Sequence, residues 1–549
     1  MAEIDRAVRP APDEDRTPID LGGLVRGLRR LRALADRPRD APQQLALFGA
    51  APTLPGPRSL PFLGRRRSAA FPVLPGAEPI RADRWARYLL VAVMAGYIAL
   101  FSFWTVRNHR GFGTYAFDFG IYDQGLWLLS KFKSPFVTVM GRQLFGDHTS
   151  FILLPLVPVY WLLPSAGVLL VSQAAALGLG ALPTFLIARD KLRDEMLAAL
   201  LAAAFLLQPA LGWTNLEHFH PDVFEVPLAL FLLWFMTRQR WIGYFVCLGL
   251  LLMVKEDVVL FAFALGIYVA VKHDRRVGLL TSGLSLLYAL VALKVILPHL
   301  NGVGTLNGWR IPFGGPVGFL RTLVAHPGRV IAYMTAGKRL WYAWQLFVPL
   351  GLVALAAPGV LLIGIAALGS NMVSTFVYQY DIHYHYTTLI LPVIMVATIY
   401  GVARWPARAD RQKLVGLVLA ASLVTAYLWG PTPLGRHEAF IADPRSATVA
   451  SFHQAARLLP ADAVVSTYYG WLPQIDHREE VYMFPTPFKA AYWGTFKQEG
   501  QRLPQADRVE YLLLPSSLDP EPKAVFDTIR GNFDVVYDQA GVMLLRRKA

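Results

Sequence analysis

The chain has 549 residues, of which 54% are hydrophobic and 17% charged, with a mean hydropathy of +0.39. This composition excludes an ordinary soluble protein and predicts an all-α polytopic membrane protein, because many apolar runs are long enough to span a bilayer. The net charge is +15, but Lys and Arg gather in the N-terminal tail and in short connections between apolar runs, as cytoplasmic loops do. We therefore expect membrane lipids and no nucleic acid as partners.

Residues 1–82 are rich in Pro, Arg, Asp and Ala, and they lack the apolar core and cleavage site of a signal peptide. We expect a disordered, basic cytoplasmic tail. Residues 21–35 are predicted to form a basic amphipathic helix, and residues 65–67 form a second basic cluster. Both are candidates for contact with anionic lipid head groups, the alternative being a solvated tail.

About 11–12 membrane segments are predicted from the apolar runs. The first, at 86–106, is preceded by basic residues, which places the N-terminus in the cytoplasm and residues 107–148 outside. The other runs lie at 149–163, 166–188, 196–212, 222–237, 241–254, 257–271, 277–297, 342–357, 359–379, 386–403 and 413–430.

The basic connections decide how these runs are threaded. They lie at 189–193, 238–240, 272–276 and 404–413. All four face the cytoplasm only if residues 149–188 cross the bilayer once. The proline-broken run 149–163 is therefore predicted to be a re-entrant or interfacial segment.

The same threading places every remaining polar cluster on the outer side, including the loop 298–341. Soluble character returns in residues 431–549, with helices predicted at 445–459 and 521–531, short apolar runs typical of strands, and a hairpin around residues 539–541. We expect three parts: the tail, a transmembrane domain at 83–430, and a small extracytoplasmic α/β domain.

The first outer loop carries two polar motifs, FDFGIYDQGLW at 117–127 and GDHTS at 146–150. They contain Asp118, Asp123, Asp147 and His148, in a connection too long and too polar for a turn between membrane helices. We interpret it as an outward-facing active-site loop.

Residues 121–132 of this loop have helical spacing and are predicted to form a short amphipathic helix on the membrane surface. Asp118 stands just before that helix, so the alternative is a simple N-cap. Asp123, five residues later, does not share a helical face with it.

The motif EHFHPDVFE crowds ionisable side chains into the mouth of a membrane segment, where each costs free energy unless it is paired or hydrated. Its substrate-binding candidates are Glu217, His218, His220 and Asp222. Because His218, His220 and Asp222 alternate, they are also candidate ligands for a divalent cation in an extended turn. The alternative is a hydrogen-bonded helix start with Asp222 as the cap.

The triplet Lys255, Glu256 and Asp257 has apolar residues on both sides. Lys255 is a candidate for neutralising a phosphate, and Glu256 or Asp257 for accepting hydrogen bonds from hydroxyls. A structural salt bridge among the three is the alternative.

The motif YQYDIHYHY alternates polar and aromatic residues, so an extended segment would place Asp381, His383 and His385 on one side. Aromatic rings beside hydrogen-bonding groups suit sugars, although an interfacial aromatic belt is the alternative. Candidates for holding a phosphate lie in the loop 298–341 and are Arg310, Lys338 and Arg339.

Several of these motifs together resemble a known family. They are FDFGIYDQGLW, GDHTS, LPTFLIARDKL, LEHFHPDVFEVP, LLMVKEDVVL, HYHYTTLILP and LPADAVVSTYYGWLPQIDHREEVYMFP, in this order over about residues 87–549. The set resembles the polytopic membrane proteins of domain of unknown function 2079, which look like C-type (GT-C) glycosyltransferases.

The GT-C resemblance implies a polyprenyl-phosphate-linked sugar donor and a glycan, lipid or protein acceptor, reached from the outer face of a bacterial plasma membrane. In that class an acidic residue of the first outer loop acts at the acceptor hydroxyl; Asp118 matches it, with Asp123 second. Lys255 and Arg310 would stabilise the departing phosphate, and a single displacement would invert the anomeric centre. No cofactor is implied beyond a possible divalent cation. The first loop lacks the Asp-Glu dipeptide of many mannosyl-transferring relatives, so no sugar is assigned.

Two other functions fit an apolar chain with polar outer loops. A transporter or lipid flippase would also place charges near the membrane, but the charges lie on one side and we find no paired half-repeats. A non-catalytic envelope assembly protein would use the outer domain to bind a partner. It predicts that alanine at Asp118 leaves cellular function intact.

Overall fold

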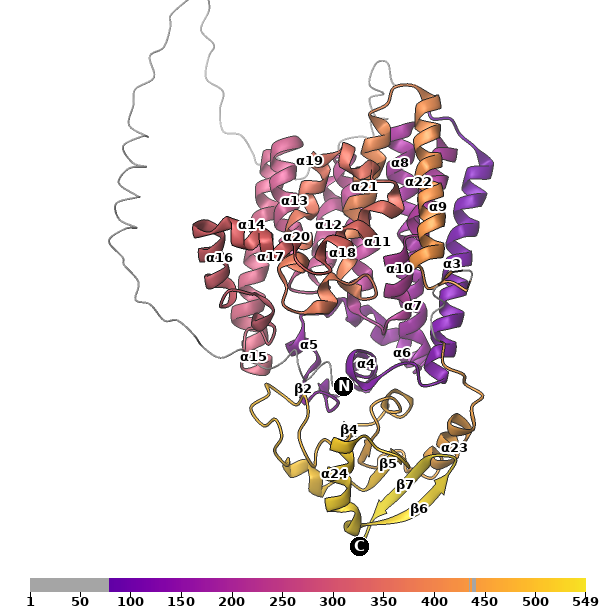
Figure 1. Ribbon diagram of the computed structural model, residues 1–549, viewed down its shortest axis with the longest axis vertical. Helices are drawn as coiled ribbons and strands as arrows, with labels where there is room; N and C mark the ends of the chain where they lie inside the picture. The colour runs from indigo at the N-terminus through magenta and orange to yellow at the C-terminus, as the bar shows by residue number, and fades with distance from the viewer. Residues whose placement is uncertain (1–78, 434, 437–440) are drawn as a thin grey trace, which may run out of the picture. The chain divides into compact units, whose positions relative to one another are not determined.

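A computed structural model describes residues 79–433, 435–436 and 441–549, which belong to one compact unit, Glu78–Ala549. The predicted tail helix at 21–35 and the basic cluster at 65–67 lie outside the described residues. The described chain is mostly helical and ends in a small domain with a five-stranded sheet (Figure 1). This is the predicted fold class.

Five helices in the described part are long and apolar enough to cross a bilayer. The first is α3 (Arg84–Arg110), and the second joins α7 (Gly167–Leu179) to α8 (Ala181–Leu192). The third runs from α14 (Arg275–Val291) to α15 (Leu297–Asn301). The last two are His385–Ala403, which contains α21 (Ile390–Ala403), and α22 (Arg408–Trp429). The pair α9 (Glu195–Leu206) and α10 (Pro209–Leu216), bent by 49°, forms a sixth if it is one span. These helices account for predicted runs at both ends of the transmembrane domain.

The remaining predicted runs form shorter apolar helices. They include α11 (Glu225–Thr237), α12 (Trp241–Leu252), α13 (Val258–Lys272), α19 (Pro358–Leu361) and α20 (Ile365–Val373). The predicted run 342–357 is not one helix, because α18 (Arg339–Phe347) gives way to 3-10 turns around Gly351 and Leu352, both with positive φ.

The run 149–163 forms a short helical segment made of η2 (Phe151–Leu156) and α6 (Val157–Leu162), with Pro155 inside it. At about 1.5 Å per residue its dozen residues reach about 18 Å, well short of the roughly 30 Å hydrocarbon core. The length therefore supports the predicted re-entrant or interfacial segment.

Helix α21 occupies the centre of the transmembrane domain. Most of its span is buried, whereas α3, α14 and α22 bury only small parts of theirs. On α14 the side chains of Leu279, Leu287 and Leu290 are more than half exposed. Such outward leucines are costly in water and suit contact with lipid.

The loop 298–341, which is predicted to lie outside, is helical, and the sequence analysis did not predict these helices. It contains α16 (Gly315–Ala325) and α17 (Pro327–Thr335) before α18 begins. Pro316 and Pro327 lie in the first turns of these helices. The backbone N–H groups of a first turn have no partner within the helix, so a proline there starts the helix instead of breaking it.

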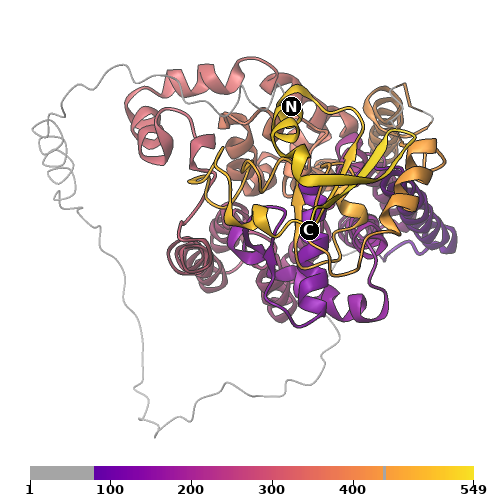
Figure 2. The same cartoon turned by 90° about the horizontal axis from the view of Figure 1, so that it is seen from below.

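The C-terminal domain confirms the predicted elements. Helices α23 (Ala447–Ala456) and α24 (Pro520–Ile529) accompany strands β3 (Val465–Thr467), β4 (Val481–Met483), β5 (Tyr511–Pro515), β6 (Phe533–Gln539) and β7 (Val542–Arg547). The sheet order is β4-β3-β5-β7-β6, with β3 parallel to β4 and β5. Figure 2 shows this domain in yellow, in front of the helices. The β6–β7 hairpin turns at Ala540 and Gly541, whose φ values of 46° and 80° suit a tight hairpin turn.

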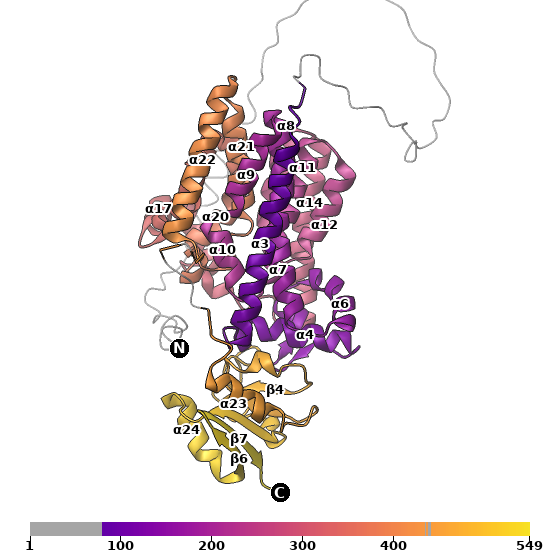
Figure 3. The same cartoon turned by 90° about the vertical axis from the view of Figure 1, so that its right-hand side faces the viewer.

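The first outer loop lies between the helical bundle and this domain, and α4 (Ile121–Ser130) is its main element (Figure 3). The helix forms as predicted, but its position on an open membrane surface was wrong. Gln124 Nε2 donates to the Arg478 carbonyl at 3.1 Å, and Thr138 Oγ1 donates to the Val481 carbonyl at 2.8 Å. The C-terminal domain covers α4, so both faces of the helix are buried.

Candidate active site

Asp118 has a backbone conformation that few residues with a side chain adopt. It lies in the irregular turn η1 (Ala116–Gly120) at φ 65° and ψ −78°, close to a strained γ-turn. Gly120 occupies the N-cap position of α4, and no side chain of the described residues caps this helix. The N-cap interpretation of Asp118 is therefore wrong. Strain of this kind costs about 1–3 kcal/mol and gathers at functional sites.

The turn after α10 brings His220 to Asp118. The helix ends at Leu216, and the chain runs extended to His220 before η3 (Pro221–Phe224) begins. The His220 ring donates from Nδ1 to the His218 carbonyl at 3.0 Å, which directs Nε2 to Asp118 Oδ1 at 3.4 Å. His220 is buried, whereas the Asp118 side chain is 48% exposed. Asp118 is thus held from the protein side and open on the other.

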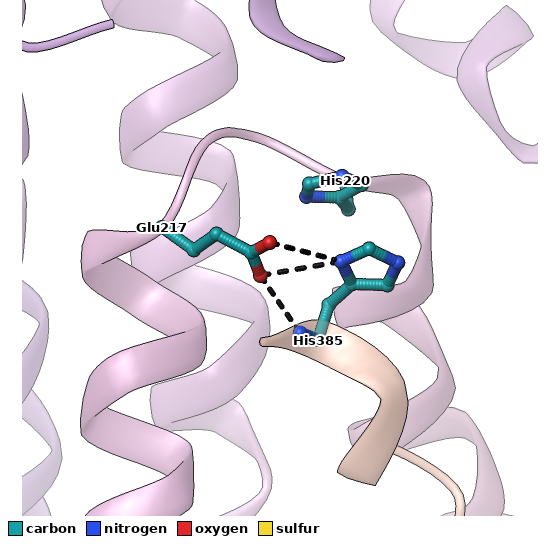
Figure 4. A group of neighbouring side chains, drawn as sticks. All are labelled: Glu217, His220 and His385. Atoms are coloured by element: carbon teal, nitrogen blue, oxygen red, sulfur yellow. Dashed lines mark hydrogen bonds and ion pairs between the residues drawn. The ribbon is translucent and has the colours of Figure 1, made fainter. Parts of the chain in front are cut away.

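His385 reaches the same place from a third segment, the turn η10 (His385–Thr387), as Figure 4 shows. Its backbone N–H donates to Glu217 Oε2 at 2.7 Å, and its Nδ1 lies 3.2 Å from the same oxygen. The His385 ring stacks on His220, with centroids 3.6 Å apart. Glu217, His220 and His385 therefore form one buried group beside Asp118.

A buried ion pair extends this group. Lys255, in the turn between α12 and α13, donates from Nζ to Asp222 Oδ1 at 3.1 Å and lies 4.0 Å from Asp257 Oδ2. Asp222 Oδ1 is also 3.9 Å from His385 Nε2. Of the predicted salt bridge within the triplet, only the 4.0 Å contact between Lys255 and Asp257 forms. The shorter bond of Lys255 goes to Asp222, which connects the pair to the histidines.

The charges of the group are set by burial and by mutual attraction. Burial raises the pKa of Glu217 to about 8. Burial alone would lower the pKa of His220, but Glu217 and Asp118 raise it to about 9. Low-dielectric surroundings oppose the charge of Asp118, yet His220 outweighs them and holds its pKa below the usual range. Asp118 is consequently a carboxylate facing an imidazolium.

A divalent cation would find a different ligand set from the one predicted. Glu217, His220 and His385 each offer a ligand atom, all within 4.8 Å of one another. The predicted ligand His218 instead packs its ring against Tyr115, at 4.9 Å between centroids, and burial lowers its pKa to about 4. Asp222 is paired with Lys255. The cation itself stays a prediction.

The GDHTS motif forms a second group on the far side of Lys255. His148 Nδ1 lies 2.7 Å from Glu256 Oε1, and the Thr149 N–H donates to Glu256 Oε2 at 3.2 Å. Asp147 accepts from Arg142 Nη1 at 2.7 Å. The two predicted motifs GDHTS and Lys255–Asp257 therefore meet, although 107 residues separate Thr149 from Glu256.

The predicted alternation of YQYDIHYHY was wrong. Two 3-10 turns, at 377–380 and 385–387, replace the extended segment and rotate His385 inward. Asp381 and His383 stay exposed and bind one another, with Oδ1 and Nδ1 2.5 Å apart. The structure does not bring these two residues to Asp118.

Asp123 is also separated from the group around Asp118. It lies on α4 with 1% of its surface exposed and accepts a hydrogen bond from Tyr160 Oη at 2.7 Å. Its other neighbour is His477 of the C-terminal domain. The geometry gives no support to Asp123 as the catalytic base.

Of the three predicted phosphate ligands in the loop 298–341, Arg310 borders the group. Its Nη1 lies 3.4 Å from Tyr386 Oη, its guanidinium lies over Phe376, and its Nε has no hydrogen-bond partner among the described residues. Arg339 is buried and donates to the Met372 and Ser374 carbonyls, and Lys338 is exposed.

Tyr386 is the site residue that the sequence analysis missed. Its ring lies 5.7 Å from Lys255 Nζ and next to His385, at 4.1 Å between centroids. Tyr386 also contacts Arg310, so its ring lies between the arginine and His385. Its place beside His385 in the aromatic motif was the available signal.

Comparisons with known proteins agree with this architecture. The family model described as "Predicted membrane protein (DUF2079)" matches residues 108–544. No curated protein matches the chain. The crystal structure of ArnT from Cupriavidus metallidurans bound to undecaprenyl phosphate is 13% identical, with a TM-score of 0.53, covering 85% of this chain and 99% of that one. The apo structure of the same protein is 12% identical, with a TM-score of 0.49, covering 84% and 98%. The first similarity shows the GT-C fold.

Proposed function

Because the chain belongs to the DUF2079 family of predicted membrane proteins and has the fold of ArnT, we propose that it is a membrane glycosyltransferase. It takes a sugar from a polyprenyl-phosphate-linked donor and transfers it to an envelope acceptor at the outer face. The observation that carries the proposal is Asp118: a strained, half-exposed carboxylate at the edge of a buried polar group. The undecaprenyl phosphate bound to ArnT supports a lipid phosphate as the partner.

Asp118 is the proposed general base. As the acceptor oxygen attacks the anomeric carbon, Asp118 takes the hydroxyl proton and the bond from that carbon to the phosphate oxygen breaks. The lipid phosphate leaves with the bonding electrons, and the single displacement inverts the anomeric centre. The His220 imidazolium holds the carboxylate in position from the buried side.

The departing phosphate needs positive charge. Lys255 is buried and paired with Asp222, so it has no exposed face for a phosphate. Arg310 is part-buried, and its Nε has no partner among the described residues. We therefore assign the phosphate to Arg310, with the Tyr386 hydroxyl beside it. Lys255 is assigned to hold Asp222 in place.

A transfer assay tests the proposal. Full-length protein in lipid nanodiscs is given a panel of labelled polyprenyl-phosphate sugars with bacterial envelope lipids and glycans as acceptors, and released polyprenyl phosphate is measured. Asp118→Asn should lower the rate at least about 100-fold, the usual effect of losing a general base. Asp507→Asn is the matched control, because Asp507 is an exposed carboxylate paired with Arg502 in the C-terminal domain.

Two outcomes would contradict the proposal that the protein is a glycosyltransferase. If labelled lipid crosses a liposome bilayer with no sugar transferred, the protein is a flippase. If Asp118→Asn preserves both transfer and cellular function, the outer face serves assembly with another envelope protein.

A further inference from the structure

A second group of chemistry-bearing side chains lies where the C-terminal domain covers α4. Asp123 comes from α4, and Asp476 and His477 follow the turn η11 (Leu472–Gln474). One ligand atom from each lies within 4.8 Å of the others. Asp123 and Asp476 are 1% and 2% exposed. Nothing in the proposed transfer reaction uses these residues.

Two carboxylate oxygens of this group lack a hydrogen-bond donor. Asp123 Oδ1 accepts from Tyr160 Oη at 2.7 Å and lies 3.1 Å from His477 Nε2. Asp123 Oδ2 and Asp476 Oδ2 are buried and have no partner among the described residues. A buried acceptor without a donor costs about 1–3 kcal/mol, and more when it is charged. Two ionised carboxylates here also repel each other, so the group needs either a cation or a shared proton.

The neighbouring Arg478 donates no hydrogen bond to either carboxylate. Arg478 donates from Nε to the Ile475 carbonyl and from Nη1 to the carbonyls of Pro460 and Ala463. These contacts direct Arg478 to the backbone.

A cation from solvent can reach this group through an adjoining cavity. A cavity of about 360 Å³ adjoins the group, and His453, Arg457, Gln474 and His477 are among its lining residues. The His477 side chain is 28% exposed and stands between this cavity and Asp123. Two carboxylates and one imidazole are ligands that Zn²⁺ accepts, with a remaining position for water.

We propose that Asp123, Asp476 and His477 bind a divalent cation of the Zn²⁺ class, which joins the C-terminal domain to the first outer loop. Tyr160 orients Asp123 from behind, as groups bound to metal ligands commonly do. Because α4 begins three residues after Asp118, the cation also fixes the helix that follows that residue. The role is structural and stands whether or not the protein transfers sugars.

Metal content and thermal stability of the purified full-length protein test the site. Wild type equilibrated with Zn²⁺ and passed through a desalting column should retain about one equivalent more than His477→Ala or Asp476→Asn. EDTA should lower the wild-type unfolding temperature, and added Zn²⁺ should restore it. His453→Ala is the matched control, because it removes an imidazole from the same cavity outside the ligand set.

The difference between wild type and variants isolates this site from any ion at Glu217, His220 and His385, which the substitutions leave intact. If wild type and His477→Ala retain equal zinc, the proposal is wrong. It is also wrong if EDTA leaves the wild-type unfolding temperature unchanged, because the two carboxyls then share a proton. Should one of the two variants fail to fold, the other provides the comparison with wild type.

Discussion

At the scale of single residues, Asp118 combines two features that seldom occur together. Its positive φ disfavours any residue with a Cβ, and its carboxylate is half-exposed beside a buried imidazole. A residue that only shaped the turn would be glycine, which adopts this conformation without strain. The aspartate is thus retained at a cost in stability, which is typical of a side chain required for chemistry.

This cost can be measured. Asp118→Gly should unfold at a higher temperature than Asp118→Ala, by about 1 kcal/mol in free energy of unfolding, because glycine relieves the backbone strain that alanine keeps. Both variants should be inactive in transfer. Urea titration of the two proteins checks the difference, and equal stabilities would show that the turn is not strained.

Alanine substitutions of Arg310 and Arg339, both in the loop 298–341, should have different effects on lipid binding and on stability. Arg310→Ala should weaken binding of polyprenyl phosphate about tenfold or more while leaving the unfolding temperature unchanged, because a charge-assisted hydrogen bond contributes about 1.5–3 kcal/mol. Arg339→Ala should lower the unfolding temperature, because the Met372 and Ser374 carbonyls lose their donor. Lipid binding and thermal unfolding of both variants check this, and a reversed pattern would move the phosphate site to Arg339.

At the scale of elements, the connections between helices assemble the site more than the helices do. The turn after α10 contributes Glu217 and His220, and η10 contributes His385. The turn between α12 and α13 adds Lys255. The GDHTS motif is attached to this last turn by His148 and Glu256. These turns are therefore expected to respond to charge changes as one unit.

The His148–Glu256 pair predicts a pH dependence of stability. Burial alone would lower the pKa of His148, but Glu256 raises it above the usual value of about 6.5, so the folded protein holds this proton more tightly than the unfolded chain. The pair's contribution is full below about pH 6.5 and is lost as pH rises through the raised pKa. His148→Gln should flatten the decline of unfolding temperature above pH 6.5. The exposed His326→Gln should not, and an unchanged profile in His148→Gln would contradict the assignment.

At the scale of the whole molecule, the membrane topology determines whether all the polar loops lie on the same side of the bilayer. Replacing Cys247, which is free and buried, by alanine provides a background for single reporter cysteines. Cysteines at the exposed positions Leu458 and Ser165 should react with an impermeant maleimide added to intact cells. A cysteine at Arg276 should react only after permeabilisation. A cysteine at Ser165 that reacts only from the cytoplasm would show that 149–163 crosses the membrane.

Much of the fold follows from local properties of the chain. The apolar runs predict the long helices α3, α14 and α22, because a bilayer-spanning segment must be long, apolar and internally hydrogen-bonded. Short apolar runs and the turn at 539–541 predict the C-terminal strands and their hairpin. The local signal failed at α16 and α17, where prolines in first turns start helices.

The sequence by itself determined which residues are candidates, because ionisable side chains beside apolar runs require partners or water. The sequence alone does not show which of these side chains form ion pairs with one another. The tertiary structure shows that His220 contacts Asp118 and that Lys255 pairs with Asp222. It also shows that Asp123 lies away from the catalytic group and contacts His477 of the C-terminal domain. The physical reason is that these contacts join turns distant in sequence, and helix packing, not local spacing, brings such turns together.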